Sequence, residues 1–232
     1  AYINRMYIIK NYNYVLKSVQ SLSKNTSLIV VTKNQDLDNI NLLVKANHIN
    51  FGENRVQELV EKQALLPKDI RWHQIGHLQT NKVKYIAPFV HLIHTVDSLK
   101  LLLEINQQAK KNNRVINCLF QMYIAQEETK FGLLPNELHE ILENPILAEL
   151  KNIQIIGLMG MASFTENTDQ INKEFTSLAQ LLRDLKSNQT AMHLGNIAWE
   201  ELSMGMSSDY LLAAELGSTL VRVGSAIYGA RE

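Results

Sequence analysis

The apolar and polar positions along the chain form a repeated alternation of short apolar runs with amphipathic segments. Near the start, apolar residues recur at steps of three and four, at Ile8, Tyr12, Val15, Val19 and Leu22. This spacing lines one face of a helix, so we predict a helix ahead of the first strand. A buried strand then ends at Lys33, and "DLDNINLLVKANH" follows with helical spacing and an acidic first turn. The basic unit of the chain is therefore a strand followed by a helix.

The same unit recurs to the end of the chain. The later strands are predicted at "INFGEN", "IRWHQIG", "HLIHTVD", "RVINCLFQMYIA", "IQIIGLMGMA", the weak "ELSMG" and "TLVRVGSAIYG". We count eight strands that alternate with helices. Strands that are apolar on both faces are typical of parallel sheets covered by crossover helices. We therefore predict a (β/α)8 TIM barrel with an extra N-terminal helix, as a single domain over residues 1–232.

An open doubly wound α/β sheet is the competing architecture. Such sheets usually mark their first strand-to-helix turn with a glycine-rich phosphate loop, and the turn "TKNQD" contains no glycine. No low-complexity or Pro/Gly-rich linker divides the chain. The closed barrel is therefore the favoured fold.

Composition narrows the class of ligand. Lys plus Arg and Asp plus Glu each number 23, so no net charge exists to attract nucleic acid or an anionic membrane. No apolar run approaches the length that spans a bilayer. A single cysteine, Cys118, and the lack of a basic leader with an apolar segment favour a cytoplasmic location. We therefore expect a small molecule as the partner, with no nucleic acid and no membrane.

Polar residues at the strand ends are the candidate functional groups, because the active face of such a barrel is built from the C-terminal ends of its strands. Lys33 lies at one of these ends. A strand-terminal lysine often only extends to water, but at an apolar barrel mouth its amine could form a Schiff base with an aldehyde. Glu53 and Asn54 are expected at the same level, although the asparagine could instead cap a helix.

A candidate anion site lies at the last two strand ends, where loops of this fold frequently bind phosphate. Its residues are Met206, Ser207, Arg222, Gly224 and Ser225. Glycine lets an anion approach the backbone and serine adds a hydroxyl donor, although Gly224 could serve barrel curvature and Ser207 could cap a helix. Arg222 favours the site, because an arginine that points into a barrel needs a partner.

The histidines and the cysteine give no sign of a metal site or a nucleophile. His73 and His77 are four residues apart, which on an extended segment separates them by roughly 13 Å, too far to share one ion. Cys118 lies inside a predicted strand, where a buried thiol is the usual case. The chain has neither a Gly-x-Ser-x-Gly elbow nor a Walker loop. We therefore predict no metal.

Several ordered motifs together identify a family. They are "VTK", "FGENRVQE", "WHQIGHLQTNK", "HTVDS", "IIGLMGMA", "LSMGMSSDY" and "GSTLVRVGSAIYGAR". In this order they closely resemble the pyridoxal phosphate homeostasis protein family, over about residues 8 to 231. The resemblance implies a barrel like the N-terminal domain of alanine racemase, with pyridoxal 5'-phosphate (PLP) as its cofactor.

The resemblance also implies a role for each candidate residue. Lys33 matches the lysine that holds PLP as a Schiff base, and Arg222 matches the arginine that faces the pyridine nitrogen. Ser207, Gly224 and Ser225 match phosphate-binding positions. Residues expected beside the cofactor or along its cavity are Asn54, Met159, Met161, Ser203 and Met206. PLP needs an amine, an anion site and a group opposite its ring nitrogen, and the strand ends supply all three.

Three features favour cofactor binding over catalysis. An arginine only donates, so Arg222 favours an unprotonated pyridine nitrogen and weakens the ring as an electron sink. Alanine racemases also use a tyrosine from the second domain of a partner subunit, and this chain ends at Glu232, soon after the eighth strand. After Lys33, "NQD" stands where those racemases have small residues and a Tyr-Gly-His stretch. We therefore predict a monomeric PLP carrier in vitamin B6 homeostasis, not an enzyme, with apo PLP-dependent enzymes as candidate recipients.

Two other functions stay open as hypotheses. One is a PLP-dependent amino-acid racemase of restricted scope; its candidate bases are His77, Tyr123 and Tyr228. The other is an aldolase that uses Lys33 directly on a sugar phosphate. Lys82 and Lys130 are candidates for a transient second contact with PLP, although solvated loop lysines are the simpler interpretation.

Overall fold

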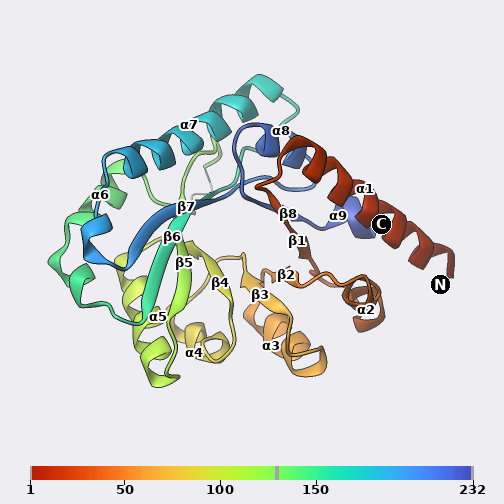
Figure 1. Cartoon of the computed structure of the whole chain (residues 1–232), viewed down its shortest axis with the longest axis horizontal. Coiled ribbons are helices and arrows are strands. Elements are labelled where there is room, and N and C mark those ends of the chain that lie inside the picture. Colours follow the sequence, from red (N-terminus) through yellow and green to blue (C-terminus); the bar gives the residue numbers. More distant parts are fainter. Residues whose placement is uncertain (1, 129–130, 231–232) are drawn as a thin grey trace.

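The computed structural model describes residues 2–128 and 131–230, and its eight parallel strands close into a barrel in the order β1 to β8 (Figure 1). The strands are β1 (Ser27–Val31), β2 (Asn50–Glu53), β3 (Arg71–Gln74), β4 (Leu92–Val96), β5 (Ile116–Met122), β6 (Ile153–Gly160), β7 (Ile197–Ser203) and β8 (Leu220–Val223). The barrel closes where β1 pairs with β8, with Ile29 opposite Arg222. The predicted (β/α)8 fold is therefore confirmed.

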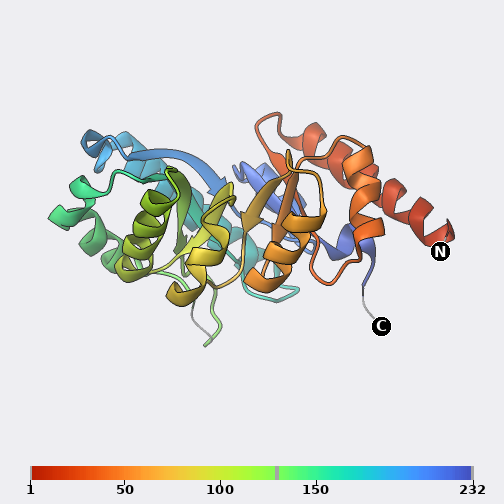
Figure 2. The ribbon, with the colours of Figure 1, turned by 90° about the horizontal axis from the view of Figure 1, so that it is seen from below.

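Helices surround the barrel and alternate with its strands (Figures 1 and 2). They are α1 (Tyr2–Leu22), α2 (Leu37–Lys45), α3 (Val56–Leu65), α4 (Val83–Ile86), α5 (Leu99–Lys111), α6 (Pro135–Glu143), α7 (Thr168–Ser187), α8 (Tyr210–Glu215) and α9 (Ser225–Tyr228). One predicted helix, "QTNKVKYIA", is split into the 3-10 turn Thr80–Lys82 and the single turn of α4. Among the residues described, no helix is long and apolar enough to cross a membrane.

The extra N-terminal helix, α1, packs beside α8 and α9, so the first and last helices of the chain are neighbours (Figure 1). Its buried residues are Ile8, Tyr12, Val15 and Val19, as the spacing predicts. Leu22 was predicted on the same stripe but is 39% exposed, because α1 ends at this residue. The stripe therefore covers the barrel only up to the last turn of α1.

The main apolar core lies between the strands and the surrounding helices. Its largest fully buried side chains are Trp72, Trp199, Phe51, Phe120 and Phe175. Cys118 is buried in β5, as predicted for a structural thiol. A smaller apolar group, Leu92, Leu119 and Met159, brings together side chains of β4, β5 and β6.

One glycine is required by the pairing of β6 with β7. The register of this pair shifts between Ile155 and Gly157. A Cβ atom on Gly157 would lie 1.8 Å from the carbonyl oxygen of Glu201, so no side chain fits there. Such a bulge redirects the strand that follows it, and here it precedes Met159 and Gly160 at the C-terminal end of β6.

Candidate functional site

Lys33 lies in the turn between β1 and α2, and its side chain is exposed. Asn34 adopts a left-handed backbone conformation with a φ of 57°, which asparagine tolerates better than most residues. Asp36 caps α2, because its Oδ1 accepts a hydrogen bond from the amide of Asn39 at 2.8 Å. The "NQD" segment therefore stops β1 and starts α2, and it leaves Lys33 at the C-terminal mouth of the barrel.

The three predicted phosphate-binding residues lie together beside this turn. Ser207 Oγ accepts hydrogen bonds from the amides of Gly224 at 3.2 Å and Ala226 at 3.1 Å, which joins the loop after β7 to the start of α9. A Cβ atom on Gly224 would lie 3.1 Å from the carbonyl oxygen of Val31, two residues before the lysine. Glycine therefore lets the end of β8 approach the end of β1, with Ser225 exposed next to it. We call Ser207, Gly224 and Ser225 the anion cradle.

Arg222 is 3% exposed, and each of its two Nη atoms donates one hydrogen bond within the barrel. Its Nη1 donates to Ser203 Oγ, and its Nη2 donates to the carbonyl oxygen of Gly160 at 3.2 Å. Burial lowers the pKa of Arg222 to about 10, and attraction to Asp209 opposes this shift. The guanidinium therefore stays positive at neutral pH and is held in a fixed orientation.

Ser203 connects Arg222 to a buried polar chain that crosses the barrel. His94 Nδ1 lies 2.8 Å from Ser203 Oγ. His94 Nε2 lies 2.9 Å from His73 Nδ1, and His73 Nε2 lies 3.0 Å from Asn50 Oδ1. Because β4 and β7 are not neighbours in the strand order, the contact between His94 and Ser203 passes through the barrel interior. We call these five residues, from Arg222 to Asn50, the interior polar chain.

The interior polar chain has one direction of hydrogen-bond donation. Asn50 Oδ1 only accepts, so a neutral His73 donates to it from Nε2 and accepts at Nδ1. His94 then donates to His73 from Nε2, and its Nδ1 accepts the hydrogen of Ser203, whose oxygen also accepts from Arg222. This pattern needs both imidazoles to be neutral. Burial lowers the pKa of each histidine well below its usual value, which meets that requirement.

Glu53 and Asn54, predicted at the level of Lys33, have different surroundings. Glu53 is buried, and its Oε1 binds Lys62 Nζ at 2.6 Å. Burial raises the pKa of Glu53 to about 7, although Lys62 opposes the shift. Asn54 is half-buried and precedes Arg55, after which α3 begins without a side-chain cap, so Asn54 does not cap a helix. Its side chain stays a predicted contact of the site.

The predicted methionines lie at two levels of the barrel. Met161 and Met206 are 37% and 45% exposed, and both line a cleft of about 180 Å³ together with Asp209. Met159 is buried beneath them and packs against Leu92 and Leu119. The structure therefore brings Met161 and Met206 to the mouth, whereas Met159 is part of the interior.

The loop residues with open roles are also placed. His77 is exposed, and its Nδ1 lies 3.7 Å from Asp97 Oδ2. Lys82 is exposed with its Nζ 5.8 Å from the centre of the Tyr85 ring, in accord with a solvated lysine. Lys130 lies outside the described residues. Of these candidates, His77 therefore has a carboxylate partner at the mouth.

The two candidate tyrosine bases are poorly suited to accept a proton. The hydroxyl of Tyr123 donates to the carbonyl oxygen of Glu127. The hydroxyl of Tyr228 is buried and has no hydrogen-bond partner within residues 2–128 and 131–230. Burial raises the pKa of Tyr228, and the charges of Glu53 and Asp36 raise it further. The phenol of Tyr228 therefore stays protonated at neutral pH.

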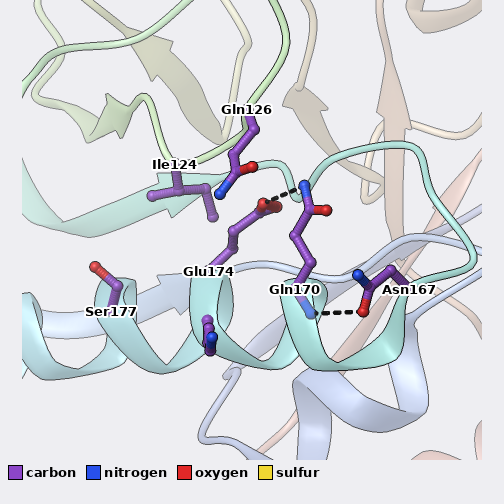
Figure 3. A pocket seen from close by; sticks show the side chains of 7 residues that line it. Ile124, Gln126, Asn167, Gln170, Glu174 and Ser177 are labelled. Atoms are coloured by element: carbon purple, nitrogen blue, oxygen red, sulfur yellow. Dashed lines mark hydrogen bonds between the residues drawn. The ribbon is translucent and has the colours of Figure 1, made fainter.

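A separate cleft of about 350 Å³ lies between α7 and the segment after β5 (Figure 3). Glu174 on its wall accepts hydrogen bonds from the amide of Ser163 at 2.6 Å and the hydroxyl of Ser163 at 2.8 Å. Gln170 Nε2 donates to the same carboxylate at 3.2 Å (Figure 3). These bonds fasten the loop after β6 to α7, so we assign this cleft a structural role.

Three polar residues near the site were not predicted, namely His73, His94 and Lys62. A signal existed for the histidines, because each is a polar residue inside an apolar strand segment and the two strands are adjacent. Lys62 gave no such signal, since a lysine on a helix usually lies in water. The folded chain nevertheless buries Lys62.

Comparison with known proteins identifies the family. Residues 3–232 match the family model described as alanine racemase, N-terminal domain. The chain is 42% identical over 183 residues to the pyridoxal phosphate homeostasis protein of Aquifex aeolicus, covering 78% of this chain and 77% of that protein. It is 38% identical over 218 residues to the human protein of the same name, covering 88% of this chain and 76% of that protein.

Solved structures agree with this family. PipY of Synechococcus elongatus, with PLP bound, has a TM-score of 0.82 at 31% identity, over 96% of this chain and 100% of that one. Alanine racemase of Bartonella henselae has a TM-score of 0.67 at 18% identity, over 97% of this chain and 59% of that one, which shows the fold alone. From the matched family model and these relatives, the chain belongs to the pyridoxal phosphate homeostasis protein family.

Proposed function

We propose that this protein binds PLP through Lys33 and serves intracellular PLP homeostasis without robust catalysis. The observation that carries the proposal is the close approach of Gly224 to Val31, which places the anion cradle beside the strand end that bears Lys33. An amine next to an anion site suits a small ligand that carries both an aldehyde and a phosphate. The names of the relatives, and PLP in the PipY structure, support the same ligand.

Each fixed group of the site suits one part of PLP. Lys33 would hold the aldehyde end of PLP through its amine nitrogen, with loss of one water made from the aldehyde oxygen and both amine hydrogens. Ser207, Gly224 and Ser225 offer hydroxyls and backbone amides to the phosphate. Arg222 would donate a hydrogen bond to the ring nitrogen. The remaining proposed contacts are Asn54, Met159, Met161, Ser203 and Met206.

The setting of Arg222 supports a carrier more than an enzyme. When bound, PLP stabilises carbanions by drawing electrons into its ring, and a protonated ring nitrogen strengthens this effect. Arg222 only donates, and the hydrogen of its neighbour Ser203 is directed away from the site toward His94. The ring nitrogen would therefore accept a hydrogen bond without gaining a proton, which suits holding the cofactor.

One observation favours a restricted racemase as a second candidate. His77 at the mouth lies 3.7 Å from Asp97, and an imidazole beside a carboxylate is a common general base. The test is exchange of the α-hydrogen of amino acids with solvent deuterium, followed by mass spectrometry. Exchange no faster than with free PLP rules out the racemase, and rapid exchange that is lost in His77→Gln supports it.

The proposed attachment is tested by adding PLP to the purified protein, recording the absorbance, reducing with borohydride and mapping the adduct by peptide mass. We expect pyridoxyl phosphate on Lys33, its loss in Lys33→Ala, and full labelling of Lys24→Ala, which removes an exposed lysine just before β1. An adduct on another lysine, or none, would refute the proposal. The same reduction with a sugar phosphate in place of PLP tests the aldolase. A sugar-phosphate adduct on Lys33, without a PLP adduct in the first experiment, would support it.

We further propose that the protein acts in the cytoplasm as a monomer and passes PLP to apo-enzymes. Cys118, the single cysteine of the chain, is buried as a free thiol, which suits a reducing compartment. Light scattering after size exclusion measures the oligomeric state. Transfer rates to an apo-enzyme that rise with its concentration would support direct delivery, whereas rates independent of it indicate release into solution.

A further inference from the structure

The turn that carries Lys33 is held by side chains of α3, a helix of the next strand-helix unit. Lys62 Nζ donates to the carbonyl oxygen of Thr32 at 2.7 Å. Glu58 Oε2 accepts from the amide of Asn34 at 3.0 Å. These two groups belong to the peptide bonds directly before and directly after Lys33. Side chains of α3 therefore fix the backbone on both sides of the lysine, while the lysine side chain itself stays exposed.

Lys62 is fully occupied by this arrangement. Besides Thr32, its ammonium contacts Glu53 Oε1 at 2.6 Å and Glu58 Oε2 at 3.1 Å. The three hydrogens of the ammonium thus meet three acceptors. The side chain of Lys62 is 9% exposed and that of Glu53 is 0% exposed. Lys62 is therefore a fixed part of the scaffold, and Lys33 is the amine that faces the mouth.

The conformation of Asn34 shows what the arrangement holds in place. Its φ of 57° lies in the left-handed region, which residues other than glycine adopt reluctantly. The hydrogen bond from the Asn34 amide to Glu58 secures this conformation and, with it, the direction in which the Lys33 side chain leaves the backbone. Thr32 on the other side is also fixed, because its amide donates to Gly52 at 3.1 Å.

We propose that Glu58 and Lys62 are positioning residues that hold Lys33 toward the anion cradle and so set how long PLP stays attached. This inference rests on the proposed function of Lys33. Attachment requires the amine to reach one carbon of a ligand whose phosphate is held elsewhere. A fixed backbone lowers the entropy lost when both ends are bound, so a looser turn releases PLP faster without removing the amine.

Glu58 offers the sharper test, because Lys62→Met would leave the buried Glu53 without its partner and endanger folding. Release of PLP is measured by trapping it with an excess of an apo-enzyme. We expect about tenfold faster release from Glu58→Ala. Glu58→Gln keeps an oxygen that accepts from Asn34, so it should remain within about twofold to threefold of wild type. Glu61→Ala is the matched control, since Glu61 is exposed on α3 and contacts Gln57.

A second readout needs no PLP. Amide hydrogen exchange of the apo protein should be about tenfold faster at Asn34 in Glu58→Ala and unchanged in Glu61→Ala. Unchanged exchange at Asn34 would overturn the inference, and so would release within twofold of wild type in Glu58→Ala. Failure of wild-type Lys33 to form any adduct would instead overturn the proposed function, while the exchange result still reports on the turn.

Discussion

Removing the hydroxyl of Ser203 should destabilise the apo protein by breaking the interior polar chain at its centre. Ser203 accepts from Arg222 Nη1 and donates to His94 Nδ1, and it is 0% exposed. Ser203→Ala therefore leaves one charged donor and one imidazole nitrogen without partners in the barrel interior. The Arg222 guanidinium and the His94 imidazole are both buried, so water could replace the lost hydrogen bonds only by entering the barrel.

The magnitude follows from the two unpaired groups. A buried polar group without a partner costs about 1–3 kcal/mol, and a charged one costs more. Arg222 keeps its hydrogen bond to Gly160, which lowers its share. We therefore expect Ser203→Ala to lose about 2–4 kcal/mol of unfolding free energy, a large part of the typical 5–15 kcal/mol for a folded domain.

Urea unfolding of the apo protein at pH 7.5, followed by tryptophan fluorescence, measures this loss. Ser177→Ala is the matched control, because Ser177 is exposed on α7, and it should stay within about 0.5 kcal/mol of wild type. Ser203→Cys, which keeps a weak donor and acceptor, should fall between the two. A loss below about 0.5 kcal/mol in Ser203→Ala would refute the reasoning, since the two groups would then not depend on Ser203.

Three further predictions concern other parts of the fold. Burial lowers the pKa of His48 from 6.5 to about 4, so its neutral form stabilises the fold above about pH 6.5 and this contribution is lost as the pH falls toward 4. The difference in unfolding free energy between wild type and His48→Asn should shrink by about 3 kcal/mol over that range; a constant difference would contradict the assignment. Gly157→Ala should unfold at a markedly lower urea concentration or fail to fold, because its Cβ would lie 1.8 Å from the Glu201 carbonyl oxygen. The control is Gly195→Ala, whose Cβ would meet nothing within 4 Å and which should lower the unfolding free energy by only about 1 kcal/mol. Burial raises the pKa of the Cys118 thiol, so it should react with a disulfide reagent only on unfolding; rapid labelling of the native protein would show that the thiol is accessible.

The parts of the site that could be predicted are those that the order of the strands determines. Once eight strands alternate with helices, the residues that follow them must gather at one mouth, so Lys33 and Gly224 are expected together from topology alone. The close approach of Gly224 to Val31 then follows from the pairing of β1 with β8.

The parts that could not be predicted depend on which way individual side chains point. His94 and Ser203 are 109 positions apart and meet only because both face the barrel interior. Lys62 lies on a helix, where its spacing suits water, and yet its long side chain reaches Thr32 and Glu53. Apolar periodicity indicates which face of a helix is buried on average, and it does not predict the burial of a single lysine at the edge of that face.

The interior polar chain also links Arg222 to the positions of the hydrogens on the two buried histidines. A hydroxyl, an imidazole and an amide can each donate or accept, so Ser203, His94 and His73 could run in either direction. Arg222 can only donate, so it leaves the hydrogen of Ser203 free for His94 Nδ1, and this favours the Nε2–H form of both histidines. We expect nitrogen-15 spectra of the apo protein to show the Nε2–H form at both histidines.

Arg222→Glu reverses the restriction, because a carboxylate accepts. Ser203 would then donate to it and accept from His94, so both histidines should change to the Nδ1–H form and the Asn50 amide should turn to donate. Observation of the Nδ1–H form in wild type, or of no change in a folded Arg222→Glu protein, would contradict this account. If PLP binds as proposed, the same substitution would also place a group that can be protonated opposite its ring nitrogen, and this should strengthen the ring as an electron sink.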